Sequence, residues 1–361
     1  MFLNLINSEI FEASSNQNKK YDFLSSWRNL FSKNFSVLSD IDHNPQFNDR
    51  LLEAILSASF YAKDPDIILS ALFQISGVFF PLYLSSNKAL KEKWLVPLKK
   101  GEIIAAHALS EESAGTDVLN MKTCAIKKNK SWVLNGEKRY ICNAPLADLI
   151  LVYARTNKKS EKRANNKSII CFLIESNKKS IEIEKNVKKI GLNKIPMSTI
   201  RFNNHLVNHN EELCTVAQGF NFIQISTTFE RIIIPISFIG RMIKVYQTIN
   251  SFEFKNKQFN IQKSEMLIDI TQSFSLLRIA LDQINFQKWD RNYIAIGCLL
   301  KSSLSDAYLR VVKKARFIDE SENRKIFKNF SIEDEMNAAL GSWIYSGPND
   351  VLKSMLIQLC H

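Results

Sequence analysis

The stretch Ala105–Asp117 reads AAHALSEESAGTD, and the stretch Leu134–Ala144, which follows it, reads LNGEKRYICNA. Both lie in a part of the chain whose apolar residues form short runs, such as Leu149–Val152, with glycine and asparagine between the runs. Short apolar runs separated by turn-forming residues indicate strands. The Asn135-Gly136 pair is the strongest hairpin signal in the chain, because this dipeptide favours a two-residue turn between paired strands. The sequence therefore predicts an all-β region here.

Both flanks of this region show helical patterns. In the upstream flank, Leu51, Leu52, Ile55 and Leu56 recur at the spacing of one helix face. In the downstream flank the same reasoning predicts long helices over 220–251, 265–289 and 294–315. We therefore expect an α+β fold with three parts, which are an N-terminal helical domain at 1–102, a middle β-barrel domain at 103–208 and a C-terminal helical bundle at 209–361.

The composition is that of a folded protein with a sizeable core. The 361 residues are 45% hydrophobic and 23% charged. The net charge of +12 admits several partners, namely nucleic acid, a membrane surface, an anionic cofactor or an acidic protein. The same charge also arises from the codon usage of an AT-rich genome, since isoleucine, asparagine and lysine are all plentiful. Because the lysines are scattered and no aromatic residues interleave with a basic cluster, we expect no nucleic-acid partner.

Three sequence features lead us to expect a cytoplasmic protein. The six cysteines form no CxxC pair and no regular pattern, which favours a reducing compartment. The segment Met1–Ile10 has neither a basic leader nor a small-residue cleavage site, so we expect it to belong to the mature protein. The apolar stretch Ile67–Leu84 is interrupted by Ser70, Gln74 and Ser76, and we therefore expect no membrane span.

A metal site is not expected. His205 and His209 are four residues apart, the spacing of two metal ligands on one helix face. They lie among Asn203, Asn204 and Asn208, however, in what the sequence predicts to be a polar turn with solvated side chains. The sequence also offers no glycine-rich phosphate loop and no Ser-His-Asp arrangement.

Two stretches carry a resemblance to a known family. Ala105–Asp117 resembles A-x-T-E-P-x-A-G-S-D, and Leu134–Ala144 is similar to L-N-G-x-K-x-W/F-I-T-N-A, both of them motifs of the acyl-CoA dehydrogenase family. Leu90–Glu102, Ile190–Ser198 and Gly219–Arg231 are similar to further motifs of that family. The resemblance implies an N-terminal helical domain, a middle β-barrel domain and a C-terminal helical bundle, which is the order read from the patterns above.

The resemblance also implies an activity. Members of the family bind FAD and oxidise the α,β bond of an acyl thioester, so we expect an acyl substrate on CoA or on a carrier protein. A flavoprotein or similar electron acceptor would then reoxidise the flavin. Relatives assemble as homodimers or homotetramers, and we expect the same here. The basic net charge would suit an acidic carrier protein.

Glu230 is the expected general base. In most members of the family a glutamate precedes Gly-Thr near the C-terminus, but this chain has Ser346 followed by Gly347-Pro348. A subset that resembles isovaleryl-CoA dehydrogenase and the aminoacyl carrier-protein dehydrogenases instead has the base in the motif F-x-x-E-R, and this chain has Glu230, followed by Arg231, at that position. Abstraction of the weakly acidic α-proton needs a carboxylate with a raised pKa. The backbone N–H of Ser346 is expected to contact the thioester carbonyl.

The resemblance assigns flavin contacts to two groups of residues. The first group is expected to contact the flavin of its own chain and consists of Leu109, Ser110, Gly115, Thr116, Tyr140, Ile141 and Cys142. The second group is expected to contact the flavin of a neighbouring subunit and consists of Lys257, Gln258 and Phe259. Lys257 lies near the position of an arginine in relatives, and a lysine holds phosphate only as a point charge. Cys142 replaces a threonine and is a weaker hydrogen-bond donor.

Two rival functions remain open on the sequence. One is a degenerate relative that keeps the fold, binds flavin weakly or not at all, and acts as a binding or structural subunit. The altered positions Asn256 and Pro348 and the loss of the family's C-terminal glycine segment favour it. The other is an oxidase or monooxygenase, whose flavin would react rapidly with oxygen.

Overall fold

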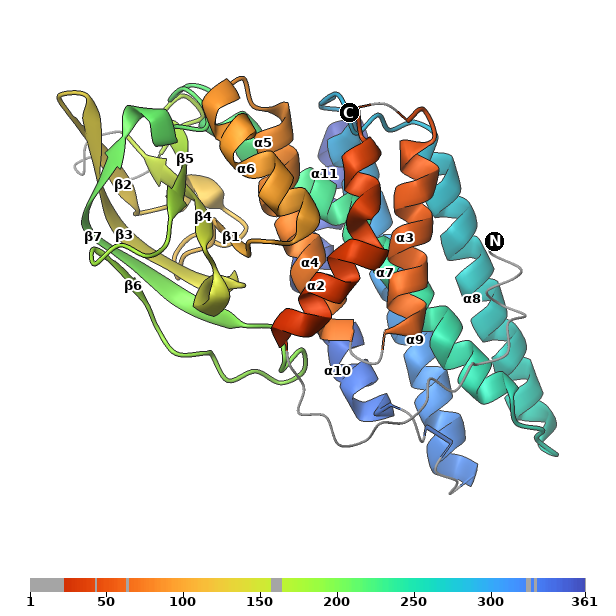
Figure 1. Ribbon diagram of the computed structural model, residues 1–361. Helices are drawn as coiled ribbons and strands as arrows, with labels where there is room; N and C mark the ends of the chain where they lie inside the picture. The colour runs from red at the N-terminus through yellow and green to blue at the C-terminus, as the bar shows by residue number, and fades with distance from the viewer. Residues whose placement is uncertain are drawn as a thin grey trace.

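A computed structural model describes residues 23–42, 44–62, 65–156, 164–322, 326–327 and 330–360. The segment Met1–Ile10, expected to belong to the mature protein, lies outside these residues. Figure 1 shows a curled sheet on one side of the molecule and a helical bundle on the other, with helices α4 (Pro65–Gln74), α5 (Phe80–Leu84) and α6 (Lys88–Lys100) between them. The observed order is helices, then strands, then helices, as the sequence predicts. The residue ranges of the three domains stay a prediction.

The N-terminal helices form because their apolar residues fall on one face. In the first of them Trp27, Leu30 and Phe31 are buried at the i, i+3, i+4 spacing. The Trp27 indole N–H donates to the carbonyl of Gly101, which ends the last helix of the group in the left-handed conformation. The elements are α2 (Phe23–Lys33), α3 (Phe47–Tyr61), α4 (Pro65–Gln74), a π-helical turn (Ile75–Phe79), α5 (Phe80–Leu84) and α6 (Lys88–Lys100).

The expectation of no membrane span rested on an interrupted apolar stretch, and the structure differs on that premise. The π-helical turn joins α4 and α5 into one continuous helix, so Asp66–Leu84 is long and apolar enough to cross a membrane, and so is Gly219–Asn250. In the two apolar windows 89% and 83% of the residues are buried inside the protein. Core helices of folded domains pass the same test of length and composition, and one or two such helices are weak evidence for a membrane protein.

The strands form one curled sheet. Their order is β1-β4-β2-β3-β7-β6, with β5 also paired to β4. The β4–β5 and β3–β7 pairs are antiparallel, whereas β1 runs parallel to β4. The strands are β1 (Ala105–Ala108), β2 (Cys124–Lys128), β3 (Ser131–Cys142), β4 (Leu149–Arg155), β5 (Ile169–Glu175), β6 (Ile181–Ile183) and β7 (Met197–Asn208).

The expected hairpin turn at Asn135-Gly136 was wrong. Both residues lie inside the continuous strand β3, and the turn between β2 and β3 is formed at Asn129 and Lys130. The β3–β7 register shifts between Leu134 and Gly136, which marks a β-bulge. Gly136 has φ +146°, and a Cβ on it would lie 2.6 Å from the Cα of Thr123. The glycine therefore serves a bulge with close backbone contact.

The C-terminal bundle consists of α7 (Gly219–Asn250), α8 (Lys257–Leu281), α9 (Tyr293–Glu322), α10 (Ile332–Gly341) and α11 (Asn349–Cys360). The second helix begins and ends eight residues earlier than the predicted range 265–289. Asn256 caps its start, because its side chain accepts a hydrogen bond from the backbone N–H of Gln258. Beyond the other end, Asn285 starts a turn, in which its side-chain oxygen accepts a hydrogen bond from the backbone N–H of Gln287.

A buried ion pair supports the loop after β1. The Lys138 ammonium donates to the Glu111 carboxylate at 2.8 Å and to the Leu109 carbonyl at 3.0 Å. Glu111 also accepts from the backbone N–H groups of Lys122 and Thr123. Burial alone would raise the pKa of Glu111, but Lys138 and the N–H donors outweigh it and hold that pKa below its ordinary value. The loop that carries the first motif is thus fastened to β3.

The pair gives a stability prediction with a neighbouring control. Glu111→Gln leaves the fully buried Lys138 ammonium without its carboxylate, and removing one partner of a buried pair costs about 3–5 kcal/mol. Glu112→Gln removes only an exposed partner of Arg139 and should leave stability nearly unchanged. Guanidinium unfolding of both variants compares the two free energies. Equal stability of the two variants would contradict a supporting role for the pair.

Candidate active site

A cavity of about 720 Å³ lies between the sheet, helix α7 and the turn before α11. Its size is that of a ligand site. Nine of the residues predicted from the sequence line it, and they come from four separate parts of the chain. They are Leu109, Ser110, Gly115, Thr116, Tyr140, Ile141, Cys142, Glu230 and Ser346.

Three predicted residues do not line this cavity. Lys257, Gln258 and Phe259 lie at the start of α8, and the first two are exposed. Phe259 is 5% exposed and packs against Phe254 and Phe317, so in this chain it is a core residue. The resemblance assigns the flavin contact of these residues to a neighbouring subunit, and that contact stays a prediction.

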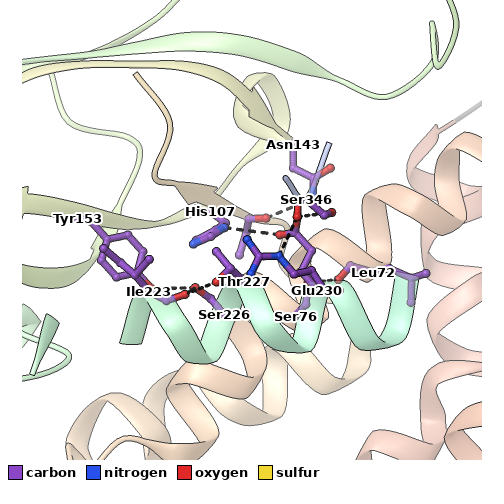
Figure 2. A network of polar contacts seen from close by, with 12 residues as sticks. Leu72, Ser76, His107, Asn143, Tyr153, Ile223, Ser226, Thr227, Glu230 and Ser346 are labelled. Carbon is purple, nitrogen blue, oxygen red and sulfur yellow. Dashed lines mark hydrogen bonds and ion pairs between the residues drawn. The ribbon is translucent and has the colours of Figure 1, made fainter. Parts of the chain in front are cut away.

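The Glu230 carboxylate is buried in the cavity wall. It lies on α7 and is 8% exposed. One oxygen, Oε1, accepts a hydrogen bond of 2.5 Å from the Ser346 hydroxyl, and the other, Oε2, lies 4.0 Å from His107 Nδ1. Figure 2 shows the three side chains converging. Burial raises the pKa of Glu230 above its ordinary value, against the opposing effects of Ser346, Arg231 and Lys301.

Two cations hold the turn that carries Ser346. Ser346 and Gly347 both have positive φ, +61° and +100°. The Arg231 guanidinium donates to the Ser346 carbonyl at 2.8 Å, and the Lys301 ammonium donates to the Gly347 carbonyl at 2.6 Å. Lys301 also donates to the Asn349 side chain. Burial and the nearby Arg231 charge lower the pKa of Lys301 to about 7.

The structure adds three residues that the sequence reasoning missed, namely His107, Arg231 and Lys301. Ala105, His107 and Leu109 all line the cavity, which follows from the two-residue period of a strand. That alternation within the quoted motif was the signal for His107. A lone lysine on the buried face of α9, in line with Cys298 and Ser305, was the signal for Lys301.

Cys142 and Tyr140 differ in their surroundings. Burial and the Glu230 carboxylate raise the pKa of the Cys142 thiol to about 12, so it remains a protonated thiol at neutral pH. Tyr140 lines the cavity, is 61% exposed and has φ +59°. An exposed aromatic ring that lines a cavity is available to stack on a ligand ring.

The prediction that His205 lies in a polar turn with a solvated side chain was wrong. His205 lies in strand β7 and is 4% exposed, and its Nδ1 is hydrogen-bonded to the Ser180 hydroxyl at 2.8 Å. His209 is exposed beside Glu212. Among the residues that the structure describes there is no group of three or more His, Cys, Asp or Glu that would hold a metal ion.

Comparisons with known proteins agree with this geometry. Residues 106–205 match the family "Acyl-CoA dehydrogenase, middle domain". The chain is 25% identical to an L-prolyl-[peptidyl-carrier protein] dehydrogenase from a Serratia species over 312 residues, which are 85% of this chain and 79% of that protein. It is 39% identical to mitochondrial isovaleryl-CoA dehydrogenase from Pongo abelii over 111 residues, which are 31% of this chain and 26% of that protein.

Solved structures show the same fold over nearly the whole chain. The apo form of PigA superposes with a TM-score of 0.84 and 21% identity, covering 99% of this chain and 95% of that one. Butyryl-CoA dehydrogenase from Megasphaera elsdenii gives a TM-score of 0.78 and 19% identity, covering 95% of this chain and 99% of that one. Residues 106–205 of this chain thus match the middle domain of the acyl-CoA dehydrogenase family, and the chain as a whole has the fold of butyryl-CoA dehydrogenase.

Proposed function

We propose that the protein is an FAD-dependent dehydrogenase that oxidises the α,β bond of an acyl thioester, with Glu230 as the general base. The observation that supports this most is the position of Glu230, a buried carboxylate with a raised pKa in the wall of the cavity that the flavin motifs also line. The relatives found by comparison are acyl-CoA and carrier-protein dehydrogenases.

The residues of the cavity fit a flavin. Leu109, Ser110 and Thr116 come from the loop after β1, and Tyr140 and Cys142 from the end of β3. The hydroxyls of Ser110 and Thr116 make no hydrogen bond with the described part of the chain, so both remain available to a ligand. When bound there, FAD would supply the acceptor for the hydride from the substrate β-carbon.

The protein side chains supply the acid–base part of the reaction. The Glu230 carboxylate takes up the α-proton of the thioester, and its raised pKa makes it a stronger base than an exposed glutamate. The Ser346 hydroxyl keeps Oε1 in place. The backbone N–H of Ser346 donates to no group within the described residues and is therefore free to polarise the thioester carbonyl, which becomes negatively charged as the proton leaves.

We infer a carrier protein as the bearer of the acyl group. Ile190 and Ile344 line the cavity and are 90% and 71% exposed, which forms an apolar rim. Lys188 and Lys194, two residues before and four residues after Ile190 in the chain, are exposed. An apolar rim with adjacent lysines would suit an acidic carrier protein. The expected homo-oligomer, flavoprotein acceptor and cytoplasmic location remain predictions.

The first prediction concerns the cofactor. The purified protein is expected to be yellow and to release stoichiometric FAD on denaturation. Lys257→Ala should weaken FAD binding about tenfold through loss of one charged contact, whereas Lys255→Ala, two residues earlier and also exposed, should not. Absorption spectra and equilibrium titration with FAD measure both effects. A colourless protein that refuses added FAD would instead support the degenerate, non-catalytic relative.

The second prediction concerns the base. Glu230→Gln is expected to keep bound FAD and to slow flavin reduction by an acyl carrier-protein thioester about 10²–10⁴-fold, since it removes the general base. Glu265→Gln, an exposed glutamate on the neighbouring helix α8, is the matched control and should react at the wild-type rate. Anaerobic stopped-flow absorbance follows the reduction. The same measurement with the corresponding acyl-CoA distinguishes CoA from a carrier protein as the carrier of the acyl group. Reduced flavin that reacts rapidly with oxygen would indicate an oxidase.

The pH dependence of the same reaction is a third prediction. Because Glu230 must be deprotonated to act, the wild-type rate should rise with pH through the raised pKa of Glu230. The midpoint should therefore lie above 4.5, the ordinary value for a glutamate. A rate that has already reached its plateau at pH 4.5 would assign the proton abstraction to another group.

A further inference from the structure

The two oxygens of the Glu230 carboxylate differ in their surroundings. Oε1 accepts the hydrogen bond from Ser346, and Oε2 faces the imidazole of His107, whose Nδ1 is 4.0 Å away. A distance of 4.0 Å is longer than a hydrogen bond. A small rotation of either side chain would bring the two atoms into contact. Figure 2 shows His107 and Ser346 approaching the carboxylate from different directions.

The position of the His107 ring is fixed by its neighbours. Beneath it, Gly77 lies in the π-helical turn, and a Cβ on Gly77 would come within 2.6 Å of His107 Cβ and 2.8 Å of Cγ. The Tyr153 ring meets the imidazole edge-on, with the ring centroids 5.6 Å apart. The Tyr153 hydroxyl is in turn bonded to α7 through Phe222 and Ser226. Gly77 therefore provides the space and Tyr153 the wall for an imidazole at this point.

The imidazole is neutral. Burial and the Lys138 charge together lower the pKa of His107 to about 4. A neutral imidazole has one donor and one acceptor nitrogen. Nε2 is buried and has no hydrogen-bond partner among the described residues. Since a buried acceptor without a partner is tolerated better than a buried N–H without one, the proton belongs on Nδ1, the nitrogen that faces Glu230.

Other groups also face the carboxylate. Arg231 on α7 itself and Lys301 on α9 are cations that favour the ionised form. Cys142 on β3 and Tyr345, beside Ser346, have pKa values raised by burial and are neutral. Both cations are occupied by the carbonyls of the Ser346–Gly347 turn. Of the groups on β1, β3, α7, α9 and the turn before α11, His107 is the one whose ring nitrogen is directed at Oε2.

We propose that His107 is a positioning residue for the base. With the His107 proton on Nδ1, the N–H is turned toward Oε2, which is the Glu230 oxygen not bonded to Ser346. The N–H holds Oε2 in the cavity and favours the ionised carboxylate. The inference rests on the proposed function, which makes Glu230 the base. Oε2 is then the oxygen that receives the α-proton, and Ser346 and His107 each hold one of the two carboxylate oxygens.

A titration of Glu230 that needs no substrate tests this directly. The full chain, labelled with ¹³C at the glutamate carboxyls and supplied with FAD, is titrated by NMR, and the signal lost in Glu230→Gln identifies the residue. His107→Phe should raise the midpoint of the Glu230 titration by about one pH unit, because the ionised form loses a donor. His107→Asn, which keeps an amide donor near the position of Nδ1, should restore at least half of that shift.

The chain offers a matched control. His205→Phe removes a second buried histidine, also without a partner at Nε2 but outside the cavity, and should leave the Glu230 titration unchanged. Should the Phe ring not fit beside Gly77, His107→Leu carries the same expectation. A Glu230 midpoint that is the same in the wild type and in the folded apolar variant would overturn the proposal. Failure of the proposed function would appear differently, as a shifted Glu230 titration in a protein whose flavin no acyl thioester reduces.

Discussion

The hydrogen bond from the Ser346 hydroxyl to Glu230 is the contact on which the cavity depends. It joins α7 to the turn before α11, two elements that are 116 residues apart in the chain. Keeping a carboxylate away from water is costly unless it is hydrogen-bonded or paired with a charge. The structure meets this cost in two ways: the Ser346 hydroxyl bonds the carboxylate directly, while Arg231 and Lys301 bring positive charge near it.

The same two cations also fix the shape of the turn. They donate to the carbonyls of Ser346 and Gly347, where the backbone has positive φ, a conformation that is unfavourable for a serine. A fixed turn keeps the Ser346 hydroxyl at one oxygen of Glu230 and its backbone N–H at the cavity. Ser346, at which the resemblance would place the base of most family members, is here the hydrogen-bond partner of Glu230, the base that we propose.

The sequence was informative wherever the structure depends on local patterns. The stretches Ala105–Asp117 and Leu134–Ala144 predicted the middle sheet and most of one cavity wall, because a strand presents alternate residues to one face. Helical spacing predicted α7 and α9. Glu230 followed from the family motif.

The failures of prediction have tertiary causes. Asn135-Gly136 was taken for a hairpin turn, whereas the glycine is required by the close approach of Thr123. His107 and Lys301 act through neighbours that are distant in sequence, Glu230 for the first and Gly347 for the second, and single residues on a strand or helix do not reveal such neighbours. The contact predicted for Lys257 is with the flavin of a neighbouring subunit, and Lys257 accordingly lies outside the cavity of its own chain.

The central claim is that Glu230 removes the α-proton of an acyl thioester. Exchange of the substrate α-hydrogens with deuterated water measures that step alone, if the thioester has α-hydrogens but no β-hydrogen to transfer. The FAD-loaded wild type is predicted to catalyse the exchange, and Glu230→Gln with bound FAD is predicted to lose it. Exchange that persists in the folded Glu230→Gln protein would contradict the account.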